Sequence, residues 1–242
     1  MDRNGKVLIL ALLVPLIVFL SDRAAPPAAL AGLALAVWAM LGVLTDLADR
    51  SGLARLPPRT AWLRLRHLPR GIWGYGLAHF GVGVLIVGIV VSTAWRSERI
   101  ETMRPGDTLT IAGRTLRLVG VTEGDIANYH AQRAQIVVER PGSPAMVLYP
   151  ERRWYPVARS QTTNTAIATN GFGDLYLALG DPDDGGGWVL RAYYNPLVPW
   201  IWFGAVLAAL GGLVSLSDRR LRLRQPATRA STAVGIRSMD AR

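Results

Sequence analysis

A histidine, His79, lies inside an uncharged, glycine-rich apolar run that spans residues 71–95. The run is longer than the roughly 20 apolar residues that a helix needs to cross a bilayer. An ionisable side chain at membrane depth is costly, so His79 indicates a functional contact. Gly76 and Gly83, one turn away on either side, are expected to leave room for another helix or a flat ligand.

Imidazole in such a place can do several kinds of chemistry. It can be an axial ligand of haem iron, shielded from water by the protein. It can also hydrogen-bond across a helix interface or relay protons, and the residues alone leave these alternatives open. A six-coordinate haem would need a second ligand, which the apolar runs of this chain do not offer. His67 and His130 lie in polar segments and are expected to be surface residues.

The elements that position His79 are predicted by hydropathy. Apolar runs at about residues 7–20, 28–47, 71–95 and 197–217 predict a membrane protein with about four transmembrane α-helices. The first run is the shortest, at about 21 Å of helix against a hydrocarbon core of about 30 Å. Residues 96–196 between the third and fourth runs predict a β-rich domain with turns at 105–107, 112–113 and 141–143. The expected strands are 108–111, 115–121, 134–139, 145–149, 175–179 and 188–194.

The net charge of +10 indicates how the chain is oriented in a membrane, and it does not indicate nucleic-acid binding. Residues 96–196 contain eleven arginines and eleven acidic residues, so the excess lies in the N-terminal stub, the loop 50–70 and the tail 218–242. Since cytoplasmic loops are rich in Lys and Arg, both termini and loop 50–70 are expected to be cytoplasmic and residues 96–196 to lie on the outer side of the membrane, which the resemblance given below makes the periplasm. The tail after Gln225 is expected to be disordered.

Other candidate groups are weaker. The run Glu151–Tyr155 could grip haem propionates or a partner protein, but a strand with its aromatic residues in the core and its arginines in water is favoured. Tyr193 and Tyr194 are expected to be interfacial anchors, and the acidic segment 181–187 a turn. Because the chain has no cysteine, it cannot attach haem through its own thiols or exchange disulfides. Its three widely separated histidines cannot build a zinc site.

Several stretches together resemble the C-terminal part of the CcmF-type cytochrome c haem lyase subunit. They include Leu-Ala-His-Phe-Gly-Val at 77–82, Leu-Tyr-Pro-Glu-Arg-Arg-Trp-Tyr-Pro-Val at 148–157, Asp-Leu-Tyr-Leu-Ala-Leu-Gly at 174–180 and Arg-Ala-Tyr-Tyr-Asn-Pro at 191–196. Shorter matches lie at 97–99, 105–107, 128–129, 200–202, 211–212 and 218–220. Their order and spacing agree over about residues 70–222.

The resemblance implies a component of cytochrome c maturation in the bacterial inner membrane. Such proteins receive haem from a periplasmic haem chaperone and join it to apocytochrome c, together with thiol-handling factors. They also hold a haem b in the membrane, and the position of His79 matches a histidine ligand of that haem. His79 is therefore the expected cofactor-binding and metal-ligating residue, and no catalytic residue is assigned.

The family's tryptophan-rich haem-handling motif and the second haem b histidine belong to an upstream part that has no counterpart here. The chain is thus expected to be a truncated or split haem lyase subunit, inactive without an N-terminal partner portion. Two rival hypotheses are a cofactor-free docking protein, whose periplasmic domain binds apocytochrome or maturation partners, and a membrane module of an unrelated transporter.

Overall fold

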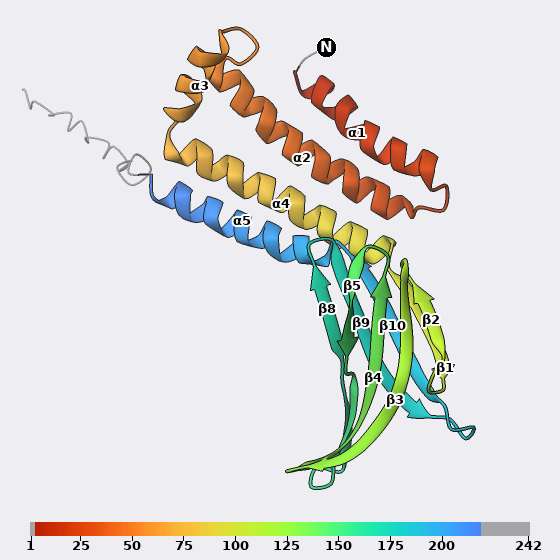
Figure 1. Cartoon of the computed structure of the whole chain (residues 1–242). Coiled ribbons are helices and arrows are strands. Elements are labelled where there is room, and N and C mark those ends of the chain that lie inside the picture. Colours follow the sequence, from red (N-terminus) through yellow and green to blue (C-terminus); the bar gives the residue numbers. More distant parts are fainter. Residues whose placement is uncertain (1–2, 219–242) are drawn as a thin grey trace, which may run out of the picture.

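The computed structural model describes residues 3–218, so the expected disordered tail after Gln225 lies outside the described part. Four helices lie side by side and a β-domain extends from one end of them (Figure 1). Three of them are long and apolar enough to cross a membrane, and the other contributes a shorter apolar stretch at 7–21. The fold expected from hydropathy is confirmed, with a short additional helix in the arginine-rich loop. The helices are α1 (Arg3–Ser21), α2 (Pro27–Ser51), α3 (Pro58–Arg66), α4 (Arg70–Ala94) and α5 (Val198–Leu216).

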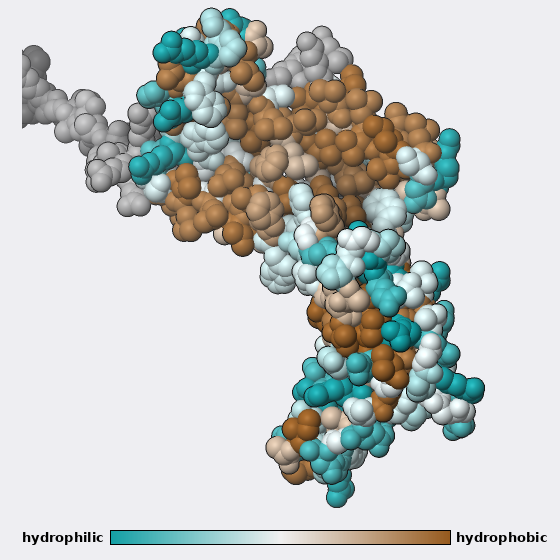
Figure 2. Space-filling view, viewed as in Figure 1, coloured by the Kyte–Doolittle hydropathy of each residue, from teal (hydrophilic) through white to brown (hydrophobic). Residues whose placement is uncertain are grey.

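The helices present a broad apolar surface, drawn in brown in Figure 2. Leu16, Ile17 and Leu20 of α1 and Phe203 and Leu213 of α5 are among the exposed side chains. An apolar surface of this extent has to be covered by lipid or by other helices, because water solvates it poorly. The hydrophilic surface lies over the loop that contains α3 and over the β-domain (Figure 2).

Glycines set how closely α4 and α5 approach. Gly74, Gly81 and Gly88 recur every seven residues on α4, and Gly204 and Gly211 do the same on α5. A Cβ built on Gly81 would lie 2.5 Å from the backbone nitrogen of Ala208, and one on Gly74 would lie 2.6 Å from the carbonyl oxygen of Gly211. The two backbones are therefore in direct contact. Small residues permit such packing where no hydrophobic effect drives helices together.

The β-domain is a sandwich of two antiparallel sheets. One sheet has the order β1-β10-β9-β8 and the other β2-β3-β4-β6-β7. Strand β5 also pairs with β4, along residues 136–140, whereas β6 pairs with residues 130–133. Alternating apolar residues of both sheets form the core, among them Leu116, Ile136 and Leu177. The six expected strands are present, and four more complete the sheets. The strands are β1 (Ser97–Met103), β2 (Thr108–Ile111), β3 (Arg114–Ile126), β4 (Tyr129–Arg140), β5 (Ser143–Leu148), β6 (Glu151–Tyr155), β7 (Ser160–Asn164), β8 (Ala166–Asn170), β9 (Gly173–Pro182) and β10 (Trp188–Pro196).

Hydrogen bonds tie the sandwich to the helices. The indole nitrogen of Trp200 donates to the carbonyl oxygen of Gly171 at 2.8 Å, and the backbone nitrogen of Leu197 donates to Phe172 at the same distance. At the same end, the Trp95 indole donates to the Asp22 carboxylate at 2.9 Å. Tryptophan suits this place because its ring is apolar and its N–H needs a partner.

The opposite end of the bundle is closed by a carboxylate. Helix α4 begins after a proline, which offers no side-chain cap. The Asp218 carboxylate, just beyond α5, accepts a hydrogen bond of 2.8 Å from the backbone nitrogen of Gly71. A carboxylate at a helix N-terminus satisfies an otherwise unpaired N–H group and interacts well with the helix dipole. Asp218 therefore joins the ends of α4 and α5.

Candidate functional site

His79 lies on α4, where its side chain borders an open groove between helices. The groove has a volume of about 510 Å³ and receives residues from α1, α2 and α4. Its lining residues are Val7, Trp38, Ala39, Gly42, Val43, Thr45, Asp46, Arg50, Tyr75 and His79. The wall is mostly apolar or aromatic, with a few polar groups at one end, as is common for ligand pockets.

One hydrogen bond orients the His79 ring. Its Nδ1 atom lies 2.9 Å from the carbonyl oxygen of Tyr75, one turn earlier on the same helix. Because a carbonyl oxygen can only accept, Nδ1 must carry the proton, and the neutral ring then keeps its lone pair on Nε2. The Tyr75 ring also contacts the imidazole, with centroids 4.1 Å apart. The imidazole is thus oriented by its own helix and retains a free ligand atom.

The glycines beside His79 make room for another helix and not for a ligand. A Cβ on Gly76 would lie 3.3 Å from the Val43 side chain, and one on Gly83 would meet Met40, so both glycines pack against α2. The open space next to His79 comes instead from the arrangement of α1, α2 and α4. No periodicity in α4 alone could have shown that groove.

The other two histidines do not line this groove. His67 caps the C-terminus of α3, and His130 lies on β4 of the sandwich, where its side chain pairs with Asp125. Both side chains are exposed, as expected. Within residues 3–218, no three His, Cys, Asp or Glu side chains cluster as a metal site would require.

The run Glu151–Tyr155 forms strand β6, but its favoured orientation is wrong. Trp154 is 43% exposed rather than in the core, and the charged residue Glu151 is buried. Strand alternation puts Arg152 and Trp154 on the sheet face that looks toward β9, and Glu151, Arg153 and Tyr155 on the other face. The run has three charged residues followed by two aromatic ones and no alternation, so neither face could be assigned to the core from the run alone.

Glu151 is held by two arginines. Its carboxylate accepts hydrogen bonds from Arg133 Nε at 2.5 Å and from Arg153 Nε at 2.8 Å. Burial by itself would raise the pKa of the Glu151 carboxyl, but the hydrogen bonds from Arg153 and Arg133 outweigh it and lower that pKa below its ordinary value. Arg153 in turn lies 4.7 Å from the centre of the Tyr129 ring. This face of β6 is a structural ion-pair cluster.

Replacing Glu151 by Gln is expected to lower the free energy of unfolding of the sandwich by about 1–3 kcal/mol at neutral pH, because two charge-assisted hydrogen bonds are lost. A lowered carboxyl pKa stabilises the fold above the ordinary glutamate pKa of about 4.3, and that stabilisation disappears as the pH falls through the folded-state value. The difference between wild type and Glu151→Gln should therefore narrow in acid. Urea unfolding of the full chain in detergent, followed by near-ultraviolet circular dichroism at two pH values, measures it.

Glu139→Gln is the matched control. The Glu139 side chain is 56% exposed and lies 3.9 Å from Arg117 in an exposed pair. Such a pair contributes little, so this variant should unfold like the wild type. An equal loss of stability in both variants would contradict a special role of the buried Glu151 cluster.

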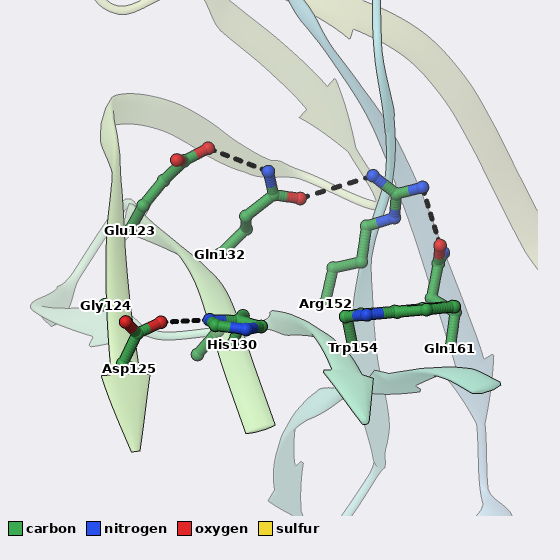
Figure 3. A pocket seen from close by; sticks show the side chains of 9 residues that line it. Glu123, Gly124, Asp125, His130, Gln132, Arg152, Trp154 and Gln161 are labelled. Carbon is green, nitrogen blue, oxygen red and sulfur yellow. Dashed lines mark hydrogen bonds and ion pairs between the residues drawn. The ribbon is translucent and has the colours of Figure 1, made fainter. Parts of the chain in front are cut away.

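A second cleft lies on the face of the larger sheet that looks toward β9. Figure 3 shows Glu123, Gln132, Arg152 and Gln161 joined in a chain of hydrogen bonds, with the flat Trp154 ring below Arg152 and the Asp125–His130 pair beside it. Arg152 also pairs with Asp181 of β9 at 2.5 Å. The cleft measures about 390 Å³.

The cleft exists because the larger sheet extends beyond the core. On β4, Ala134, Ile136 and Val138 are core residues, and His130 and Gln132 continue the same face by alternation. A register shift between Leu118 and Gly120 keeps β3 in phase with this face. The β3–β4 turn lies at the end of the sandwich farthest from the helices (Figure 1).

Comparisons with known proteins assign the family. The profile described as "CcmF C-terminal beta-sandwich" matches residues 94–196. The cytochrome c-type biogenesis protein CycK of Bradyrhizobium diazoefficiens is 42% identical over 215 residues, which cover 89% of this chain and 33% of that protein. This chain is homologous to the C-terminal third of the CcmF family.

Further matches agree. The cytochrome c-type biogenesis protein CcmF of Escherichia coli is 36% identical over 219 residues, covering 90% of this chain and 32% of that protein. A solved structure named cytochrome c heme lyase CcmF superposes with a TM-score of 0.64 at 25% identity, over 90% of this chain and 35% of the solved one. The chain spans about a third of the length of the relatives it matches. These matches confirm the resemblance seen in the sequence. They also confirm the expectation of a multi-pass membrane protein that belongs to a cytochrome c biogenesis family.

Proposed function

We propose that this chain acts with an N-terminal haem lyase portion in the transfer of haem to apocytochrome c, and that His79 provides one axial ligand to a haem b within the membrane. The observation that carries the proposal is the state of the His79 ring. Its Nδ1 is bonded to its own helix, and its Nε2 keeps a lone pair at the open groove. A hydrogen bond on the far nitrogen is how proteins orient a metal-binding imidazole.

The groove fits a tetrapyrrole in size and character. A volume of about 510 Å³ lined by Trp38, Val43 and Tyr75 offers apolar and aromatic contact to a flat ligand. When bound, a haem supplies one-electron chemistry at its iron. The residues of this chain would hold and orient it, and would exclude water from the ligand side formed by α4.

We propose that the second axial ligand comes from outside this chain. The chain has three histidines, and the other two, His67 and His130, lie in the α3 loop and on the sandwich. An N-terminal haem lyase portion, as found in the longer relatives, is the proposed source of that ligand. The relatives are about three times as long as the matched region, so their upstream portion is long enough to contribute such a ligand.

The proposed setting is the bacterial inner membrane. Loop 50–70 carries six arginines, and we propose that this end of the bundle is cytoplasmic, with both termini, while the sandwich is periplasmic. A periplasmic sandwich would meet a haem chaperone, apocytochrome c and thiol-handling factors. Lipid would cover the exposed apolar faces of the helices.

Co-expression tests this proposal. The chain is expressed alone and together with the upstream two-thirds of Bradyrhizobium diazoefficiens CycK, and the absorption spectrum of the purified material is recorded. A low-spin haem spectrum is expected in the joint preparation and should be weak or high-spin in the chain alone, because one ligand is then missing. A joint preparation free of haem would refute the haem-ligand role.

The open cleft on the sandwich favours a second candidate function, in which this chain docks a protein partner. Glu123 and Asp125 line the cleft together with the exposed Trp154. Arg152, its one arginine among the described residues, already has three partners, Gln132, Gln161 and Asp181. Within residues 3–218, Glu123 bonds only to the neutral amide of Gln132, so it could pair with a lysine or arginine side chain that lies in the cleft beside the indole. We propose that a basic segment of apocytochrome c or a maturation partner binds here.

Trp154→Ala is expected to weaken capture of apocytochrome c by about tenfold or more, because central aromatic residues dominate binding energy. Capture is measured by cross-linking to the full chain in detergent. Phe172→Ala is the control, since Phe172 is also an exposed aromatic residue of the sandwich but lies outside the cleft. Docking through the cleft predicts that capture survives His79→Ala, and equal capture by the Trp154 and Phe172 variants would exclude it.

A further inference from the structure

The groove beside His79 changes from apolar to charged along α2. Trp38, Ala39 and Val43 line its apolar part, whereas Asp46 and Arg50 lie toward the end of the bundle that carries the arginine-rich loop. Arg50 is the one cationic side chain among the groove's lining residues in the described part of the chain. Its place in a mostly apolar pocket is that of a group that fixes the orientation of a ligand.

The Arg50 guanidinium is only partly engaged. Its Nε donates to the Asp46 carboxylate at 2.6 Å, and the side chain is 47% exposed. Across residues 3–218, no hydrogen bond joins either of its terminal nitrogens to the protein. An exposed pair four residues apart on one helix is weak, so another carboxylate can replace or share Asp46 at little cost. A guanidinium binds carboxylates through two parallel hydrogen bonds, which these terminal nitrogens can supply.

Helix register brings Arg50 and His79 to a similar height. A Cβ on Gly76 would lie within 4 Å of Val43 and Leu47, so position 76 of α4 stands opposite residues 43–47 of α2. Side chains tilt toward the N-terminus of their own helix. In α4 this moves the His79 ring toward Tyr75, whose ring it contacts, and in α2 it moves Arg50 toward Asp46. Both head groups therefore converge on the same part of the groove from two helices.

We propose that Arg50 pairs with a propionate of the haem whose iron His79 ligates, and so positions the porphyrin between α2 and α4. This inference rests on the proposed haem role of His79. The two haem carboxylates carry negative charge into a membrane environment, where an unpaired charge is expensive. Arg50 is a positioning residue, because it would touch the rim of the cofactor and not its iron.

Comparing two haems, one with and one without free carboxylates, distinguishes propionate binding by Arg50 from a purely structural role of this residue. The full chain, co-expressed with the upstream two-thirds of Bradyrhizobium diazoefficiens CycK and stripped of haem, is titrated with protohaem IX and with its dimethyl ester, which lacks the carboxylates. Arg50→Gln is expected to weaken protohaem binding by about tenfold or more, the usual cost of a charge-assisted hydrogen bond, and to leave ester binding unchanged. It should also lower the reduction potential of the bound protohaem, because a nearby positive charge favours the reduced iron.

Two variants complete the design. Asp46→Asn should bind protohaem at least as tightly as the wild type, since it frees Arg50 from its competing partner, and Arg55→Gln, outside the groove, should have no effect. Equal protohaem affinity in Arg50→Gln and wild type would overturn the pairing, and so would an equal loss for both haems. His79→Ala should weaken both haems. If it weakens neither, or if the wild type binds no haem, the haem-ligand proposal fails first.

Discussion

Replacing His79 by alanine is expected to remove the low-spin haem spectrum of the chain prepared with its N-terminal portion. The substitution deletes the ring nitrogen Nε2 of a residue that lines the groove, so the iron would keep at most one axial ligand. Haem content should fall by more than tenfold, since even changes in the outer shell of a metal site cost about 10–100-fold in affinity. Absorption spectra of the reduced and oxidised protein and the haem-to-protein ratio measure the effect.

His67→Ala is a closely matched control. His67 also lies in a helical segment and also places its Nδ1 against the carbonyl oxygen four residues earlier, at 2.6 Å from Leu63. It differs in its position, at the end of α3 in the arginine-rich loop. The haem spectrum should survive this change. A spectrum that survives His79→Ala, or that is lost equally in both variants, would remove His79 from its proposed role.

Replacing Gly211 by valine is expected to prevent α4 and α5 from packing as they do. A Cβ at Gly211 would overlap the backbone of Ala78 and lie 2.7 Å from the carbonyl oxygen of Gly74. Neither obstacle is a flexible side chain, so the helices would have to separate along their whole contact. Overpacking usually costs about 1–3 kcal/mol, and a backbone clash belongs at the upper end or above. The temperature at which the detergent-solubilised chain aggregates, read by size-exclusion chromatography after heating, should fall clearly.

The neighbouring residue provides the control. A Cβ on Gly212 would meet nothing within 4 Å, so Gly212→Val adds the same side chain to an open face of the same helix. This variant should behave like the wild type. Equal destabilisation by the two substitutions would show that the loss comes from helix propensity and not from the close contact of α4 with α5. Since α4 carries His79, the Gly211 variant should also bind haem poorly.

The candidate site was partly visible in the sequence. His79 stood out because an ionisable residue in a long apolar run is rare and costly, and that argument needs no tertiary structure. Arg50 did not stand out, because a single arginine at the end of an apolar run also satisfies the positive-inside rule. Only the register of α2 against α4 places it at the same groove as His79.

In strand β6, the sequence could not show which face of the strand is buried. The sequence Glu-Arg-Arg-Trp-Tyr has no apolar alternation, so the buried face could not be chosen from it. Tertiary pairing decided it. Strand β4 places Arg133 opposite Glu151, and with Arg153 it forms a cluster that allows a carboxylate to be buried. The same pairing leaves Trp154 exposed beside His130.

The apolar helices and the β-rich domain between the last two of them could be predicted from the sequence alone. The same holds for the uneven distribution of charge and for the choice of His79 as the residue to test. These follow from local properties, since bilayer length, strand alternation and the cost of an imidazole at membrane depth act on single segments. Only the tertiary structure decided which glycines contact α5 and which contact α2, where the groove opens, and which side chains meet across it. Those features depend on the relative rotation and register of separate elements, and packing between elements distant in the chain sets both.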